Sequence, residues 1–341
     1  MVVLKMANPS RRARTTLYRG TASAAVRHPP VVLEWTDACI RFGLAEESHP
    51  KHCLAWKSPP SGKLLNESEW YAILMPLLHE VYDRLMISIP TRRVILVSSH
   101  CMIRTWEAAL LQGLWNMGVP AVSKMSNLAV PSIALGLSKC LVVSLGKYFV
   151  ECVAVIDEHV LDDTYQAVPC SALWSETIQP KWTDDMERKL LSPKDPNSLV
   201  AAILKCVEKC PLLGREDAVN NLVFIGDVWR PDLPYRTVSS LRTLLKDGIP
   251  AEEGGDSLGE EEGMEEGGDP AEPLAETIML PARFDELKSL AASIAAKSVE
   301  PFGPMHVSWT GASLWATVWH RTDDEDGLSR MKWIFPPSEA V

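Results

Sequence analysis

The sequence predicts an α/β protein with two lobes. Short apolar runs bounded by proline, glycine and polar clusters indicate buried strands, and longer segments with apolar residues three and four apart indicate helices. The two patterns alternate along much of the chain. With 341 residues, of which 46% are apolar, the chain is long enough for two lobes, each with a core of its own.

The first elements are two strands followed by helices and a further strand. Val31–Leu33 follows two prolines and reads as a buried strand, and Ile40–Leu44 is expected to return beside it as a hairpin partner. Apolar residues recur at helical spacing over Glu69–Met86. The run Arg93–Val97 then predicts a buried strand, and Met102–Asn116 a helix after it. This order predicts a βα unit.

The remaining chain continues the alternation, with a second hairpin near its middle. That hairpin is expected at Cys140–Ser144 and Val150–Ile156, joined by the turn Leu145–Tyr148. Further expected elements are strands at Pro120–Ser123 and Asn221–Ile225 and helices over Met125–Leu137, Ser198–Lys209, Thr237–Leu245, Phe284–Lys297 and Gly311–Val318.

The net charge of −10 comes from one segment. Glu252–Glu272 holds ten acidic residues and no lysine or arginine, and the rest of the chain balances 34 acidic against 34 basic residues. Because this segment contains little apolar surface to bury, residues 251–273 are expected to form a disordered acidic insertion. A chain of this charge is not expected to bind nucleic acid directly, and no apolar run predicts a membrane span.

The first 28 residues are basic. They contain one lysine and five arginines without any acidic residue, together with several serines, threonines and alanines. This composition overlaps that of a mitochondrial transit peptide. The alternatives are a flexible basic arm over 1–28 and a leader that is not translated, with Met6 as a second candidate start. We favour the flexible arm or the untranslated leader.

The eight cysteines are irregularly spaced and fall mostly in apolar runs, so they are expected to be reduced core thiols. Cys206 and Cys210 lie one helical turn apart. No second Cys or His pair stands near them in sequence, so no metal site is predicted there. Reduced thiols agree with a cytoplasmic location.

Four segments resemble, in order and spacing, the nucleotide-facing parts of actin and the actin-related proteins. Val32–Pro50 resembles the first phosphate-binding hairpin of this family, Cys140–Glu158 the second, and Asn220–Arg236 the adenosine loop. Ser308–Ser313 is similar to the Trp-Ile-Gly-Gly-Ser run that opens the last core helix. The resemblance implies an actin-like (ribonuclease H-like) fold, with a first lobe from 29–137 and 305–341 and a second from 138–250 and 274–304.

The same resemblance implies a degenerate nucleotide cleft. Where the family has Asp, Gly and Ser in the first hairpin, this chain has Glu34, Thr36 and Asp37, and Arg41 replaces a lysine. The second hairpin lacks both family carboxylates, and Asn127 stands at the place of a water-positioning Gln. The residues that would face a nucleotide are Glu34, Thr36, Asp37, Arg41, Ser144, Gly146, Lys147, Gly226 and Asp227.

We therefore expect no catalysis and no required cofactor, with ATP or ADP as the nucleotide that such a cleft would hold if it binds one. Arg41 and Lys147 are the expected phosphate contacts. Without the resemblance, the same positions read as ordinary turn and core residues of a doubly wound sheet that has no ligand.

Two short connections imply reduced outer subdomains. Only 26 residues separate Gly43 from Trp70, and about 50 separate Pro169 from Asn220. In this family both places hold subdomains that contact the next subunit at the pointed end of a filament. The resemblance, closest to the divergent member at the pointed end of dynactin, implies a cap on that filament that supports dynein cargo transport. The implied partners are a filament-forming actin-related protein or actin and other dynactin pointed-end subunits, and the implied location is the cytoskeleton.

Two other functions remain open at this point. One is a nuclear actin-related subunit of a chromatin-remodelling complex, although such subunits keep or enlarge the outer subdomains. The other is an ATPase or kinase of the actin fold, which the missing carboxylates of the second hairpin disfavour.

The chain is rich in tryptophan, with twelve residues of this type. Four fall on apolar faces of predicted helices and are expected in the core, namely Trp106, Trp115, Trp309 and Trp315. Four others lie in predicted loops and are candidates for a protein interface, where large indoles are enriched: Trp174, Trp182, Trp229 and Trp333.

Overall fold

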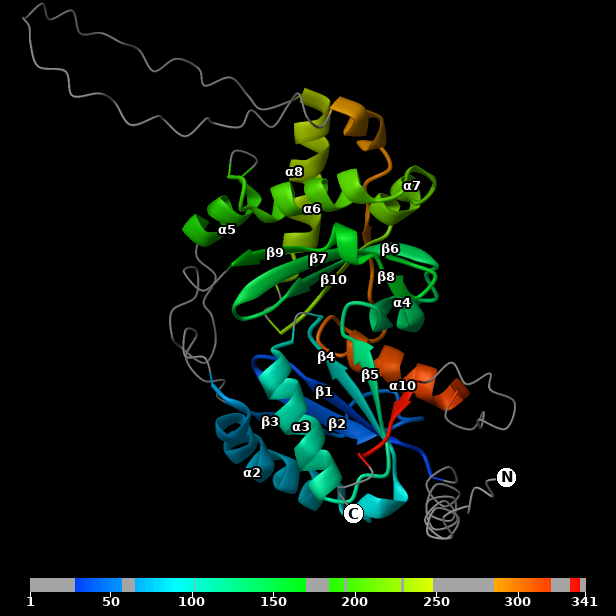
Figure 1. The fold of residues 1–341 in the computed structure, drawn as a ribbon. Helices are drawn as coiled ribbons and strands as arrows, with labels where there is room; N and C mark the ends of the chain where they lie inside the picture. The colour runs from blue at the N-terminus through cyan, green and yellow to red at the C-terminus, as the bar shows by residue number, and fades with distance from the viewer. Residues whose placement is uncertain are drawn as a thin grey trace, which may run out of the picture.

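Two mixed sheets of six strands each form the protein, one above the other in Figure 1. The computed structural model describes residues 28–56, 65–100, 102–169, 184–192, 195–227, 230–247, 285–319 and 332–337. The expected basic arm, apart from His28, and the expected acidic insertion lie outside these ranges. The predicted α/β class is confirmed.

The first sheet has the strand order β12-β5-β4-β1-β2-β3. β1 pairs antiparallel with β2 and parallel with β4, and every residue of β1 and β4 is buried. Burial along the whole strand is typical of strands that are covered on both faces. The strand bounds are Val31–Trp35 (β1), Cys39–Leu44 (β2), His52–Ala55 (β3), Val94–Ser98 (β4), Val122–Ser126 (β5) and Trp333–Ile334 (β12).

The second sheet repeats this arrangement around β6. β6 pairs antiparallel with β7 and parallel with β10, and β11 lies beside β10. Each sheet thus starts with antiparallel strands and continues with parallel strands that are reached through helices. The bounds are Lys139–Leu145 (β6), Phe149–Ile156 (β7), His159–Val160 (β8), Gln166–Pro169 (β9), Leu222–Ile225 (β10) and Ala296–Lys297 (β11).

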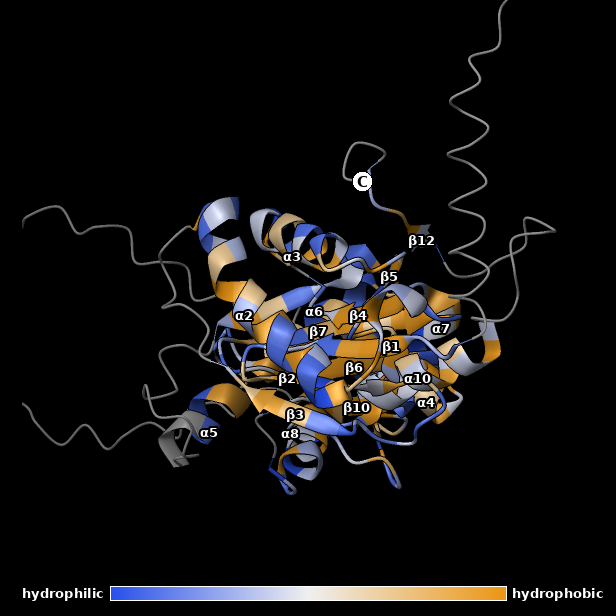
Figure 2. Cartoon of the chain, turned by 90° about the horizontal axis from the view of Figure 1, so that it is seen from below, coloured by the Kyte–Doolittle hydropathy of each residue, from blue (hydrophilic) through white to orange (hydrophobic). Residues whose placement is uncertain are grey.

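Helices α2 (Glu67–Leu85) and α3 (Arg104–Asn116) pack against each other beside the first sheet. Asn66 starts α2 with a reciprocal cap: its side chain accepts a hydrogen bond from the backbone of Glu69 at 2.9 Å, and the Glu69 carboxylate accepts one from the backbone of Asn66 at 3.0 Å. In Figure 2 the apolar residues concentrate on the strands, and the helices around them carry more polar ones.

Helices α4 (Val130–Leu135) and α10 (Val307–Trp319) pack together on the other side of the first sheet. The fully buried indole of Trp309 donates a hydrogen bond to the backbone oxygen of Val32 in β1 at 3.4 Å. Thr310 and Ser313 donate to the backbone oxygens of Ser48 and Glu47. These contacts join α10 to the first hairpin and to the residues that follow it.

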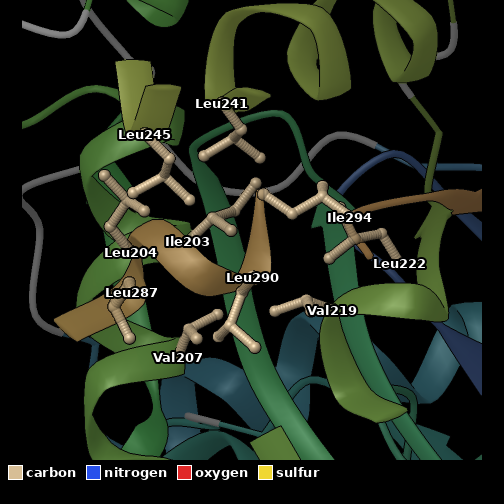
Figure 3. A pocket seen from close by; sticks show the side chains of 10 residues that line it. All are labelled: Ile203, Leu204, Val207, Val219, Leu222, Leu241, Leu245, Leu287, Leu290 and Ile294. Carbon is tan, nitrogen blue, oxygen red and sulfur yellow. The ribbon is translucent and has the colours of Figure 1, made fainter. Parts of the chain in front are cut away.

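Four helices cover the second sheet on the side away from the first sheet (Figure 1). They are α5 (Asp184–Leu191), α6 (Leu199–Lys209), α7 (Leu212–Asn220) and α8 (Leu233–Asp247). Elsewhere along the described chain lie short 3₁₀ helices: η1 (Ile89–Thr91), η2 (Asp162–Thr164) and η3 (Asp285–Leu290). Between α6, α8 and η3 lies a small pocket lined only by Leu, Ile and Val side chains (Figure 3). It is a packing gap in the core of this lobe, without polar groups.

The expected helix over Phe284–Lys297 is wrong. The chain there forms η3 and then the edge strand β11, although Leu287, Ala291 and Ile294 are buried as a helix would bury them. The backbone oxygen of Ile294 accepts a hydrogen bond from Arg242 at 2.7 Å, and β11 pairs with β10. Apolar spacing alone did not distinguish these tertiary contacts from a helix.

The expected helix over Met125–Leu137 is too long, because β5 continues to Ser126 and α4 covers only six residues. The strands β3, β8, β9 and β12 and helix α7 were not expected. No helix within the described ranges is long and apolar enough to cross a membrane.

The packing of α10 on α4 can be tested by a substitution at Gly311. A Cβ on Gly311 would lie 2.0 Å from the backbone oxygen of Val130, whereas one on Gly113, also inside a helix, would meet only the side-chain ends of Leu78 and Met75 at 2.9 and 3.0 Å. Overpacking against backbone costs roughly 1–3 kcal/mol or more, and the helical preference of alanine over glycine offsets about 1 kcal/mol. We expect Gly311→Ala to lower the free energy of unfolding by about 2 kcal/mol more than Gly113→Ala, measured by urea denaturation. Equal losses for the two variants would contradict this packing.

Candidate functional site between the two sheets

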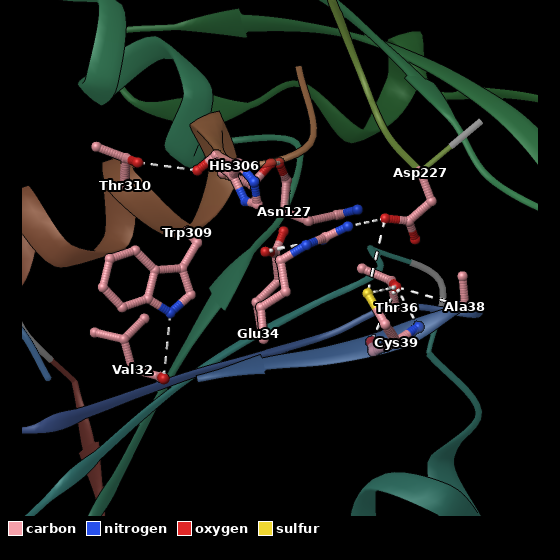
Figure 4. Close-up of polar contacts among 12 residues, drawn as sticks. Val32, Glu34, Thr36, Ala38, Cys39, Asn127, Asp227, His306, Trp309 and Thr310 are labelled. Atoms are coloured by element: carbon pink, nitrogen blue, oxygen red, sulfur yellow. Dashed lines mark hydrogen bonds and ion pairs between the residues drawn. The ribbon is translucent and has the colours of Figure 1, made fainter. Parts of the chain in front are cut away.

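The end of the first hairpin and the loop after β10 meet between the two sheets (Figure 4), and Leu145 and Gly146 at the end of the second hairpin lie close to them. The first hairpin, β1–β2, contributes Glu34 and Arg41, which lie opposite each other in the strand register. The loop after β10 contributes Gly226 and Asp227. The structure therefore brings together residues that lie 186 positions apart in the chain.

Arg41 is the centre of this site. One guanidinium nitrogen, Nη1, lies 3.1 Å from Glu34 Oε2, and the other, Nη2, contacts Asp227 Oδ1. The side chains of Arg41, Glu34 and Asp227 are only 3, 4 and 10% exposed. Arg41 thus forms a buried ion pair within the first sheet and a second one to the loop of the second sheet. We call Glu34, Arg41 and Asp227 the interlobe triad.

The triad places two carboxylates around one guanidinium, away from water. The pKa of Glu34 is raised to about 7, mainly by burial and also by the charge of Asp227, against the opposing effect of Arg41. The contact with Arg41 therefore offsets only part of the cost of burying the Glu34 charge. Charge balance in the site therefore changes near neutral pH.

Asp37 adds a third carboxyl group on the same side. Its pKa is raised to about 6 by burial and by the charges of Glu151 and Asp227, while Lys147 lowers it. Asp37 Oδ2 lies 3.7 Å from the point that a Cβ on Gly146 would occupy. The tip of the first hairpin therefore faces the turn of the second hairpin.

Thr36 serves the turn of its own hairpin. Its hydroxyl donates to the backbone oxygen of Cys39 at 3.0 Å and accepts from the backbone nitrogens of Ala38 and Cys39 at 3.3 and 3.1 Å. Trp56 donates to the backbone oxygen of Thr36 at 2.8 Å. The hydroxyl expected at a nucleotide is thus used in closing the β1–β2 turn.

Gly226 lets the loop after β10 lie directly on the second hairpin. Its φ is +121°, and a Cβ there would lie 2.4 Å from the backbone oxygen of Leu145. Its backbone nitrogen donates to the backbone oxygen of Pro304 at 3.1 Å. Buried Ser144 is paired with Ile225 in the register of β6 and β10. Only glycine fits here, and the loop holds Asp227 at the triad.

A second polar connection joins the sheets. The Glu151 carboxylate on β7 accepts hydrogen bonds from Ser99 at 3.1 Å and from Tyr165 at 2.7 Å, and Ser99 follows β4 of the first sheet. His100 Nε2 lies 3.2 Å from Asp162 Oδ1. Sequence reasoning missed Glu151, although a charged residue inside the apolar run of β7 was a usable signal.

Two further polar atoms border the triad without a hydrogen-bond partner among the described residues, Asn127 Oδ1 and His306 Nδ1. The pKa of His306 is lowered by burial and by the charges of Arg41 and His49, with Asp227 opposing. Asn127 is held through its backbone, which donates to Ser98 and accepts from Ser308.

The arrangement does not fit a bound nucleotide. The expected phosphate contact Arg41 is engaged by two carboxyl groups, and the carboxylates of Asp37 and Asp227 would repel phosphate. Lys147 is half-buried and lies 5.3 Å from the ring of Tyr148. The described residues contain no cluster of three His, Cys, Asp or Glu side chains that could hold a metal ion.

Of the interface candidates, Trp174, Trp182 and Trp229 lie outside the described residues. Trp333 was expected in a loop, which is wrong because it lies in β12, whereas its role at an interface stays a prediction. It is half-buried and pairs with Ser123 of β5. The guanidinium carbon of Arg93 lies over its ring, 4.8 Å from the ring centroid. Trp106 and Trp309 are buried as expected, and Trp115 and Trp315 are half-buried against the cores.

No protein-family model matches this chain, and no curated protein matches it either.

Glu34 should make stability depend on pH. The unfolded chain releases the Glu34 proton near pH 4.5, whereas the folded chain keeps it to about pH 7. Raising the pH across this window therefore favours unfolding, by at most about 3 kcal/mol for this group. We expect Glu34→Gln to flatten the fall in unfolding free energy between pH 5 and 7.5, measured by urea denaturation.

The matched control is Glu80→Gln, which removes a carboxylate from the exposed ion pair with Arg84. This variant should keep the pH dependence of the unchanged protein. Identical slopes in Glu34→Gln and the unchanged protein would show that the triad does not hold a proton in the folded state.

Proposed function

We propose that this chain is a non-catalytic structural subunit with an actin-like (ribonuclease H-like) fold. In this proposal the interlobe triad joins the two lobes in place of a nucleotide, and the protein caps the pointed end of the actin-related filament of dynactin, where it supports dynein cargo transport. The observation that carries the proposal is the buried contact of Arg41 with Asp227 between the sheets.

The chemistry of the site argues for a structural role. Phosphoryl transfer needs positive charge or metal ions around the transferred group, because negative charge spreads over its oxygens. Here the only guanidinium at the triad is neutralised by carboxylates of both sheets. Arg41 and Asp227 connect the lobes through the chain's own side chains, which supports a structural role.

The lengths of two connections support the capping role. Eleven residues separate β3 from α2, and 29 separate β9 from α6, with α5 among them. In the actin-like reading, these are the places of the outer subdomains that contact the following subunit. A subunit that docks by one end and offers nothing at the other ends a filament.

Nucleotide independence can be tested by thermal unfolding. A ligand at a thousandfold excess over its dissociation constant stabilises a protein by about 4 kcal/mol, which raises the melting temperature by several degrees. Because Asp227 engages Arg41, we expect 1 mM MgATP to change the melting temperature by less than about 1 °C. The control is Asp227→Ala, which removes one of the two carboxylates that pair with Arg41 and leaves Glu34 in place. A clear increase for the unchanged protein would contradict the proposed replacement of nucleotide by the triad.

Capping can be tested by imaging labelled filaments of an actin-related protein or actin as subunits add to both ends. We expect saturating amounts of the chain to stop growth at the pointed end while barbed-end growth continues. Filaments whose barbed ends are already blocked serve as the control and should stop growing altogether. Continued pointed-end growth would contradict capping, and recovery of the chain with chromatin-remodelling subunits from cell extracts would favour the nuclear alternative.

A further inference from the structure

Ionisable side chains from both sheets gather around the interlobe triad. The members from the first hairpin are Glu34, Asp37 and Arg41, and those from the second sheet are Asp227, which follows β10, and Lys147 and Glu151 of the second hairpin. We call these six side chains the interlobe cluster. Three further titratable groups lie within electrostatic reach of the triad, namely Cys39, Cys53 and His306.

The interlobe cluster holds more carboxyl groups than cations. Glu34 and Asp227 share the single guanidinium of Arg41, and none of the three side chains is more than 10% exposed. When two carboxylates share one buried site, one of them keeps its proton above the ordinary pH range. The pKa of Glu34 is accordingly raised to about 7 and that of Asp37 to about 6, both mainly by burial. The two cations of the cluster therefore face two carboxylates below this range and four above it.

Charges on the second sheet act on the carboxyl groups of the first hairpin. The charge of Asp227 raises the pKa of both Glu34 and Asp37. The charge of Glu151 also raises the pKa of Asp37, and the opposing effect of Lys147 is smaller than that of either acid. Such coupling between two sites is reciprocal. Ionisation of either carboxyl group of the first hairpin therefore weakens the contacts that bring the acidic side chains of the second sheet close to it.

Asp227 is the member of the triad that is least held by its own element. Glu34 and Arg41 lie opposite each other on β1 and β2, where the strand register fixes their separation. Asp227 lies on the loop after β10, and its side chain is the most exposed of the three. Because ionised Glu34 balances the guanidinium within the first sheet, Arg41 keeps a partner when Asp227 turns toward water. The contact that is lost first is thus the one between the two sheets.

We propose that the interlobe cluster is a proton-operated switch that sets the distance between the two sheets. With Glu34 and Asp37 protonated, the contact of Arg41 with Asp227 holds the sheets together. With both ionised, Asp227 leaves Arg41 and the sheets move apart on this side. The two protons go to water, and the switch needs no other ligand. This inference goes beyond the proposed function, because it uses the contact between the sheets and not a role in a filament.

The test is the distance between the two sheets in the full-length chain, measured by energy transfer between dyes at Met86 and Leu213. Met86 ends α2 beside the first sheet, Leu213 lies in α7 beside the second, and both side chains are exposed. Azide-bearing amino acids at the two positions carry the dyes, so that the cysteines stay unlabelled. We expect the mean distance to increase by more than about 2 Å when the pH is raised from 5.5 to 8, because this range covers both ionisations.

Two variants assign the movement to the triad, and a third is the matched control. Glu34→Gln stays neutral and should lower the increase to less than about half of that in the unchanged protein. Asp227→Asn removes the charged partner of Arg41 and should show the longer distance at both pH values.

Glu107→Gln removes a carboxylate that pairs with Lys124 inside the first lobe, and it should behave like the unchanged protein. Urea denaturation of each variant shows that it is folded. A constant distance in the unchanged protein, or an equal increase in Glu34→Gln, would overturn the proposal.

Discussion

The buried guanidinium of Arg41 connects the two sheets through ion pairs on both of its sides. It is paired with Glu34 on its own hairpin and with Asp227 on the loop of the other sheet. Removing one member of such a group leaves an uncompensated buried charge, which costs about 3–5 kcal/mol, although a well-packed apolar replacement of all members can be neutral. The triad therefore contributes more to how the two sheets are placed relative to each other than to the free energy of unfolding.

Several local features are needed to place that one contact. Thr36 closes the turn of the first hairpin, and Trp309 connects α10 to β1, so the hairpin that carries Arg41 is held on both sides. On the opposite sheet, Gly226 allows the loop to approach Leu145 and so to present Asp227. The acidic character of the site follows from this geometry. A region that would need positive charge for a nucleotide is closed by the protein's own carboxylates.

The local hydrophobic pattern was sufficient to predict the helices and strands whose packing partners are close in sequence. The strands of both hairpins and the helices α2, α3 and α6 begin and end within a few residues of their predicted bounds, because their burial follows a clear period. The pattern failed where a segment is defined by a distant partner. Residues 285–297 bury apolar side chains at helical spacing but end in a strand beside β10, and β12 forms only because β5 is available at the sheet edge.

The sequence by itself determined the α/β class and the two hairpins, since these follow from hydrophobic periodicity and turn chemistry, whereas the list of polar residues at the hairpin ends was implied by the resemblance. Arg41 was expected to meet a phosphate, and only the tertiary structure showed that it meets Asp227, 186 positions away. The same holds for the contact of Glu151 with Ser99. The physical reason is that the charge and proton occupancy of a buried group depend on which distant groups share its low-dielectric surroundings, and a linear pattern does not contain that information.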